Sequence, residues 1–119
     1  MKILVVDDDI MVLEAIAHNL RSEGYNVLIA DDGMKALDII EKQELDLIIS
    51  DIMMPNLSGL SLLSLLKQYY FNKIPVILIS ALDQSPVILS SLGLGADDFI
   101  VKPINFQELL LRVKKFEKL

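Results

Sequence analysis

The chain has 119 residues, of which 53% are hydrophobic, and this length fits one domain built around one core. Its formal net charge of −6 argues against direct contact with nucleic acid, and the absence of cysteine excludes disulfides and thiolate metal sites. No apolar run approaches the roughly 20 residues that span a bilayer and no signal peptide opens the chain, so we expect a cytoplasmic protein without membrane contact.

Short apolar segments alternate with longer segments of helical period along the whole chain. The apolar segments are rich in Val and Ile and, apart from Asp46, are continuous rather than alternating, which is typical of strands buried on both faces of a parallel sheet. In chain order we expect a strand at 3–6, a helix at 10–22, a strand at 27–29, a helix at 33–42, a strand at 45–49, a helix at 58–70, a strand at 76–79, a helix at 85–92, a strand at 99–101 and a helix from residue 106. This order predicts an α/β fold with helices on both faces of a parallel sheet.

Residues that favour helix ends flank two of the predicted helices. Asp9 is expected to cap the first helix, and Gly24 to end it. Asn105 is expected to cap the last helix, with Glu108 at the capping-box spacing. The only histidine, His18, falls on the polar face of the first helix, so we assign it no chemistry.

Polar or charged side chains follow four of the predicted strands. They are Asp7, Asp8 and Asp9 after the first strand, Asp51 after the third, Ser80 after the fourth and Lys102 after the fifth. Ligand sites in open parallel sheets form at the carboxyl ends of the strands, so we expect these groups to meet at one edge. An aspartate at such a place can attack phosphorus and form an acyl phosphate.

Carboxylates gathered at this edge repel one another. Two like charges about 4 Å apart cost about 4 kcal/mol at an effective dielectric near 20. A hard divalent cation removes that cost and also neutralises phosphoryl oxygens, which makes Mg²⁺ the natural cofactor. Asp9 is expected to cap the helix and not to bind metal.

Four stretches identify a family. They are KILVVDDD at 2–9, DLIISDIMMPNLSG at 46–59, PVILISA at 75–81 and GADDFIVKP at 95–103. With these stretches the sequence resembles the response-regulator receiver domains of two-component signalling, including the single-domain chemotaxis receiver, over essentially its whole length. The resemblance implies a flavodoxin-like, doubly wound sheet of five parallel strands in the order 2-1-3-4-5. It also implies one receiver domain over residues 1–119, with no output domain in this chain.

The resemblance implies a role for each group at the strand ends. Asp51 becomes the phosphoacceptor, Lys102 pairs with it and then with the phosphoryl group, and Ser80 donates a hydrogen bond to a phosphoryl oxygen. Phe99 is expected to swing inward when Ser80 moves, and it lacks the hydroxyl of the tyrosine that many members have there. The Lys102–Pro103 peptide bond is expected to be cis.

The resemblance also implies the Mg²⁺ ligands. Asp8 and Asp51 would supply side-chain oxygens, Asp7 would act largely through water, and Met53 would supply its backbone carbonyl. The apolar side chain of Met53 is not a Mg²⁺ ligand.

The implied function is that of a phosphorelay receiver. It would take a phosphoryl group from a sensor histidine kinase or a histidine phosphotransfer protein, and its own activity would be limited to self-phosphorylation and slow self-dephosphorylation. The predicted helix at 85–92 carries many apolar residues, so the face that it forms with the strand at 99–101 and the last helix would bind a partner or a second copy. Deep packing of that helix is an equally open interpretation.

Two alternatives differ in how the acidic residues are used. In a haloacid-dehalogenase-like phosphohydrolase, Asp7 would be the nucleophile and Asp9 the acid/base, although residue 11 is Met11 where that family prefers Thr or Val. In a degenerate receiver the domain would serve only as a binding or dimerisation module. Such domains usually lose part of the acidic pocket or the lysine, whereas this chain retains both.

Overall fold

A computed structural model describes residues 1–54, 56–68, 73–81 and 95–117 of the chain. The elements are β1 (Lys2–Val6), α1 (Ile10–Ser22), β2 (Asn26–Ala30), α2 (Gly33–Lys42), β3 (Leu47–Asp51), α3 (Gly59–Gln68), β4 (Val76–Ala81), β5 (Asp98–Lys102) and α5 (Phe106–Lys114). The predicted helix at 85–92 lies outside the described residues. Among those described, no helix is long and apolar enough to cross a membrane.

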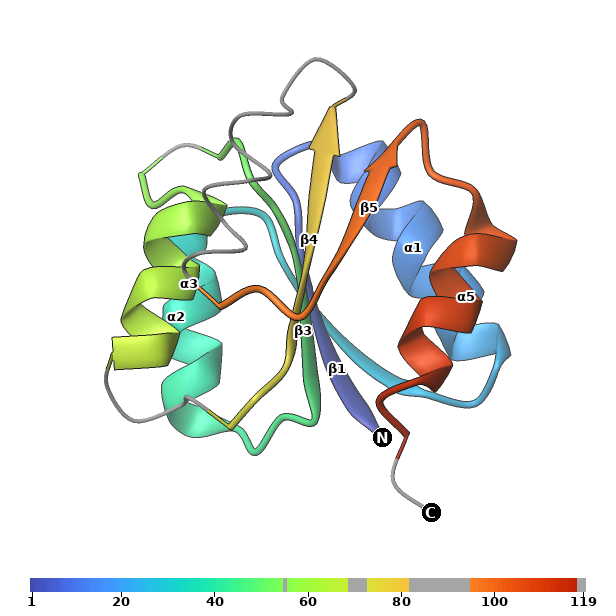
Figure 1. Cartoon of the computed structure of the whole chain (residues 1–119), viewed down its shortest axis with the longest axis horizontal. Coiled ribbons are helices and arrows are strands. Elements are labelled where there is room, and N and C mark those ends of the chain that lie inside the picture. Colours follow the sequence, from blue (N-terminus) through green and yellow to red (C-terminus); the bar gives the residue numbers. More distant parts are fainter. Residues whose placement is uncertain (55, 69–72, 82–94, 118–119) are drawn as a thin grey trace.

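The five strands form one parallel sheet in the order β2-β1-β3-β4-β5, which confirms the predicted fold. Helices α1 and α5 cover one face of this sheet, and α2 and α3 cover the other (Figure 1). The side chains of successive strand residues point to opposite faces of the sheet. In β1, Ile3 and Val5 pack in the cluster under α1 and α5, whereas Leu4 and Val6 pack in the cluster under α2 and α3. Burial on both faces explains why the strand sequences are continuously apolar.

The expected caps hold the ends of α1 and α5. Asp9 Oδ1 accepts hydrogen bonds from the backbone N–H groups of Met11 at 3.0 Å and Val12 at 3.4 Å. Asn105 Oδ1 accepts in the same way from the second and third residues of α5, at 3.0 and 3.1 Å. The capping-box spacing of Glu108 suggested that its carboxylate would accept from the backbone N–H of Asn105. The carboxylate instead accepts from Arg112 Nε at 3.0 Å.

Four of the strands end later than their apolar patterns suggest, whereas β1 ends at Val6 as expected. β3 begins at Leu47 instead of residue 45, and the backbone N–H of the preceding Asp46 donates to Lys2 O at 2.8 Å. At the other end Asp51 is the last residue of β3, and Lys102 is the last residue of β5. These polar groups are therefore held by sheet hydrogen bonding and not by loops.

Candidate functional site

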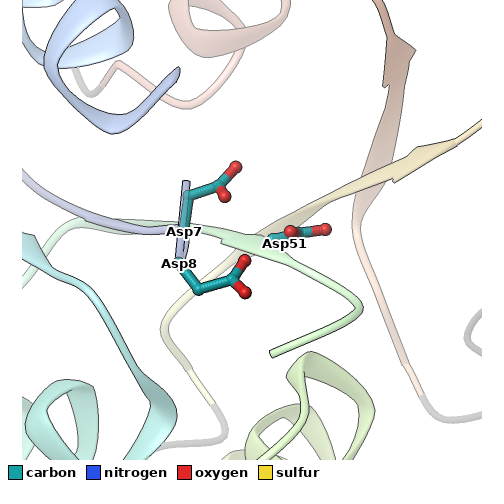
Figure 2. Close-up of side chains that lie close together, drawn as sticks. All are labelled: Asp7, Asp8 and Asp51. Atoms are coloured by element: carbon teal, nitrogen blue, oxygen red, sulfur yellow. The ribbon is translucent and has the colours of Figure 1, made fainter. Parts of the chain in front are cut away.

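The carboxyl ends of β1 and β3 bring three acidic side chains together. Val6 is paired with Ser50 in the sheet, so Asp7 and Asp51 leave adjacent strands at the same level. Asp7, Asp8 and Asp51 each present an oxygen, and these oxygens all lie within 4.8 Å of one another. Figure 2 shows the three side chains gathered at this edge of the sheet. The predicted meeting of these carboxylates is thus what the structure shows.

One ammonium group faces two of these carboxylates. Lys102 Nζ lies 3.2 Å from Asp7 Oδ2 and 3.3 Å from Asp51 Oδ2. The Asp7 side chain is completely buried and that of Asp51 is 9% exposed, so solvent screens neither charge well. The cluster therefore carries more negative than positive charge when its acids are ionised.

Asp7 is held by the start of the helix that follows it. Its Oδ1 accepts a hydrogen bond from the backbone N–H of Asp9 at 2.9 Å. Its Oδ2 is buried and finds no hydrogen bond of good geometry among the described residues, although Lys102 Nζ lies within ion-pair distance. A buried carboxylate oxygen in this condition suits a cation or an ordered water.

The environment of Asp51 disfavours its charge. Burial, followed by the negative charge of Asp7, raises the pKa of Asp51 to about 6, while Lys102 acts in the opposite direction. Burial lowers the pKa of Lys102, but the charges of Asp51 and Asp7 outweigh it, and the pKa of this ammonium group is raised overall. The backbone N–H of Met53 donates to Asp51 Oδ1 at 3.4 Å. Both pKa values are therefore raised, and perturbed pKa values of this kind cluster at functional sites.

The donor set fits a hard divalent cation. It consists of carboxylate oxygens, and neither cysteine nor histidine contributes to the cluster, which excludes a soft-metal preference. The Asp8 side chain is exposed, so water has access to the cluster, as Mg²⁺ coordination requires. The Met53 side chain is 60% exposed and its backbone lies beside Asp51. Whether its carbonyl is a ligand stays a prediction.

Gly59, the first residue of α3, packs directly behind the Asp51 backbone. A Cβ placed on Gly59 would stand 2.9 Å from Asp51 C and from Ile52 Cα, and closer still to Asp51 O. The Gly59 N–H also donates to Ile52 O at 2.9 Å. Sequence reasoning did not single out Gly59. The available signal was a glycine at a helix start that no turn required.

Ser80 and Phe99 lie on the neighbouring strands β4 and β5. Ser80 is fully buried near the end of β4, and its hydroxyl donates to Ala81 O at 3.1 Å. Phe99 is partly buried on β5 and packs against the cluster under α2 and α3. Phe99 is paired with Leu78 in the sheet. Leu78 and Ser80 are two positions apart in β4, so their side chains face the same side of the sheet. The Lys102–Pro103 peptide bond is cis, as expected.

Asp98, the first residue of β5, is held by the last helix. It forms ion pairs with Arg112 Nη1 at 2.6 Å and Lys115 Nζ at 2.7 Å, which tie α5 to the start of β5. Its side chain is only 12% exposed, so it is not a solvated charge. These partners lie 14 and 17 residues further along the chain, beyond any local pattern.

Three comparisons with solved structures agree in fold and extent. The receiver domain of the Francisella response regulator 1452 is 38% identical with a TM-score of 0.90, and the match covers 97% of this chain and 94% of that one. The receiver domain of a signal transduction histidine kinase from Syntrophus aciditrophicus is 36% identical with a TM-score of 0.90, covering 97% and 88%. The chemotaxis response regulator CheY4 of Vibrio cholerae is 31% identical with a TM-score of 0.88, covering 98% of each chain.

The family profile points the same way as these structures. The profile described as the response regulator receiver domain matches residues 3–114, which is nearly the whole chain. Its members are signalling modules of two-component systems and not enzymes in the usual sense. The carboxylate cluster, the lysine and the strand order all fit that family, and the chain belongs to the response regulator receiver domains.

Proposed function

We propose that this receiver takes a phosphoryl group onto Asp51 from the phosphohistidine of a sensor histidine kinase or a histidine phosphotransfer protein, with Mg²⁺ as cofactor. The observation that carries this proposal is the meeting of three carboxylates within 4.8 Å, with Lys102 Nζ 3.3 Å from Asp51. In this proposal residues 1–119 act as one receiver domain in the cytoplasm.

Asp51 would act as the nucleophile in its ionised form. A carboxylate oxygen attacks the phosphorus, a new O–P bond forms, the N–P bond to the donor histidine breaks, and the histidine nitrogen keeps the electron pair. A carboxyl group with a pKa of about 6 is mostly ionised at neutral pH and is more basic than an ordinary aspartate. The site thus keeps a stronger nucleophile ready without losing its charged form.

Lys102 and the Mg²⁺ ligands would stabilise the phosphoryl oxygens. The Lys102 ammonium pairs with Asp51 before transfer, and it would turn to a phosphoryl oxygen afterwards. The side chains of Asp8 and Asp51 and the backbone carbonyl of Met53 would hold Mg²⁺, with Asp7 acting through water. When bound, Mg²⁺ would neutralise negative charge that develops on the phosphoryl group. Water would later hydrolyse the acyl phosphate slowly.

Phosphorylation would then change the surface formed by β5 and α5, which we call the output face. The Ser80 hydroxyl would donate to a phosphoryl oxygen, and Phe99, on the same side of the sheet, would move inward. Val101 on β5 and Leu111 on α5 are 36% and 68% exposed, so the described part of this face already presents apolar side chains. We propose that this face, together with residues 85–92, binds an output partner or a second copy of the chain.

The test is to locate the phosphoryl group. The protein is incubated with acetyl phosphate and Mg²⁺, the acyl phosphate is trapped by borohydride reduction, and the modified peptide is identified by mass spectrometry. We expect modification at Asp51, loss of modification in Asp51→Asn, and full modification in the control Asp98→Asn. Modification at Asp7 would instead support the phosphohydrolase alternative. The structure already weakens that alternative, because the Asp9 side chain is engaged in capping α1. A protein that remains unmodified would support the binding-only receiver.

A further inference from the structure

The first residue of α2 lies against a loop of the site although it is far from the acidic cluster in sequence. Gly33 is buried, and a Cβ placed on it would stand 2.6 Å from Leu57 Cβ and 2.9 Å from Leu57 C, and closer still to Leu57 O. Real Cβ atoms do not approach other heavy atoms this closely, and backbone atoms cannot swing aside as a long side chain does. Any side chain at position 33 therefore forces a backbone to move.

Leu57 belongs to the loop that joins β3 to α3 and also carries Met53. Both ends of this loop are fixed: Asp51 ends β3, and Gly59 begins α3 against the Asp51 backbone. The hydrogen bond from Gly59 N to Ile52 O closes the loop. Between these ends, the contact with Gly33 is a third point at which the backbone of the loop is fixed.

The loop, and not α2, is the part that should yield when this contact is overfilled. Helix α2 is anchored by Ala36, which is fully buried, and by Ile40, which is 1% exposed. Its start is fixed by Asp32, whose side chain accepts from the Lys35 N–H at 2.8 Å. By contrast, none of the described loop residues between Ile52 and Gly59 is fully buried, and the Met53 side chain is 60% exposed.

We propose that Gly33 is a positioning residue for the cation site: by letting α2 touch the loop at Leu57, it sets the place of the Met53 backbone. This inference rests on the proposed function, in which the Met53 carbonyl holds Mg²⁺. Asp51 and Lys102 are strand residues whose backbones are held by the sheet, although Asp51 Oδ1 also accepts a long hydrogen bond from the Met53 N–H at 3.4 Å. A change at position 33 should therefore weaken cation binding and leave the nucleophile and the lysine in place.

The test is the variant Gly33→Ala, in which Mg²⁺ affinity and the rate of phosphorylation are measured separately. We expect about tenfold weaker Mg²⁺ binding, as is usual when the support of a metal ligand is removed. The rate of phosphorylation by phosphoramidate at saturating Mg²⁺ should stay near that of the parent protein. Binding is measured without any phosphodonor, by calorimetry and by the shift of the Met53 amide resonance on titration with Mg²⁺.

Ile16→Val is the matched control, because it removes one methylene from the cluster under α1 and α5 and lowers stability without touching the loop. We expect it to bind Mg²⁺ as the parent does. Equal Mg²⁺ affinity in Gly33→Ala and the parent would overturn the inference, and so would an equal loss of affinity in Ile16→Val. A parent protein that binds no Mg²⁺ would instead overturn the proposed function.

A second variant covers the case in which Gly33→Ala does not fold. Leu57→Ala leaves α2 untouched but removes the side chain that packs this loop against the cluster under α2 and α3. We expect a weaker affinity for Mg²⁺ in the same direction as for Gly33→Ala, with a smaller change. Unchanged affinity in Leu57→Ala would count against the loop as the element that places the cation.

Discussion

Asp51 and Asp98 are both aspartates of the sheet that lie beside basic side chains, yet their surroundings are opposite. Asp51 shares one ammonium group, that of Lys102, with the buried Asp7. Asp98 has two cations, Arg112 at 2.6 Å and Lys115 at 2.7 Å, and it also accepts from the backbone N–H of Phe99 at 2.8 Å. One site has too little positive charge for its acids, and the other has more than enough.

The pKa values follow this difference. Burial and the charge of Asp7 raise the pKa of Asp51 to about 6. Burial acts in the same direction on Asp98, but hydrogen bonds from Lys115 and Arg112 outweigh it, and the pKa of Asp98 is lowered. The charge of Asp98 thus stabilises the folded state, whereas the charge of Asp51 destabilises it. That destabilisation is what a bound divalent cation would remove.

The largest expected effect is on phosphorylation and comes from Lys102→Met. Without the ammonium group nothing among the described side chains neutralises the oxygens beside Asp51, so the rate of phosphorylation by acetyl phosphate should fall about 100-fold. Rates are measured by intact-mass spectrometry at saturating Mg²⁺. Lys115→Met, which removes a cation from Asp98, serves as the control and should react at the parent rate. Similar rates in both variants would show that the two lysines do not differ in this way.

The next largest effect is expected for Asp51→Asn. When divalent cations are absent, this variant should be more stable than the parent protein. Because the folded-state pKa is raised, the stabilisation due to neutral Asp51 is present below the unfolded value near 3.8 and is lost as the pH rises through about 6. Asparagine stays neutral, so at pH 7.5 in EDTA the free energy of unfolding should increase by about 1–3 kcal/mol. Urea denaturation at several pH values would measure it. The gain should vanish near pH 4, and a gain that persists there would have another cause.

Asp98→Asn should act in the opposite direction. Its loss leaves Lys115 without its carboxylate partner and Arg112 with only the exposed Glu108, and we expect the free energy of unfolding to fall by about 1–2 kcal/mol at pH 7. Because the folded-state pKa is lowered, this stabilisation is present above the unfolded value and is lost as the pH falls through the folded value. Glu108→Gln, which removes only an exposed partner of Arg112, is the control. An equal loss in both variants would contradict a special role for Asp98.

Much of the fold could be predicted because its signals are local. The bounds of α1 and α2 agree with the predicted ranges, since periodic burial and end signals such as Asp9 and Gly24 lie within a few residues of each other. The start of β3 was placed two residues early because Leu45 is buried by packing before the strand begins, and apolar character alone does not separate the two cases.

The candidate site could be predicted because strand ends meet at one edge of a parallel sheet, which places Asp51 near Lys102 from topology alone. The rest depends on how helices are set against the sheet. The pairing of Asp98 with Arg112 depends on how α5 is rotated about its axis. The contact of Gly33 with Leu57 depends on how close the start of α2 lies to the loop between β3 and α3. No spacing in the sequence encodes either of these distances, because both are set by the tertiary packing of the helices.

The smallest expected effect separates distance from burial. Lys35 Nζ lies 2.7 Å from Asp31 Oδ1, as close as Lys115 lies to Asp98, and Lys35 lowers the pKa of Asp31 in the same direction. The Asp31 side chain as a whole, however, is 39% exposed against 12% for Asp98, although its Oδ1 is buried, so water screens this pair more than the pairs of Asp98. We expect Lys35→Met to leave the urea midpoint unchanged and Lys115→Met to lower it measurably. If the two variants lost equal stability, the short distance alone would decide the strength of an ion pair, and burial would not account for the difference between Asp98 and the exposed pairs.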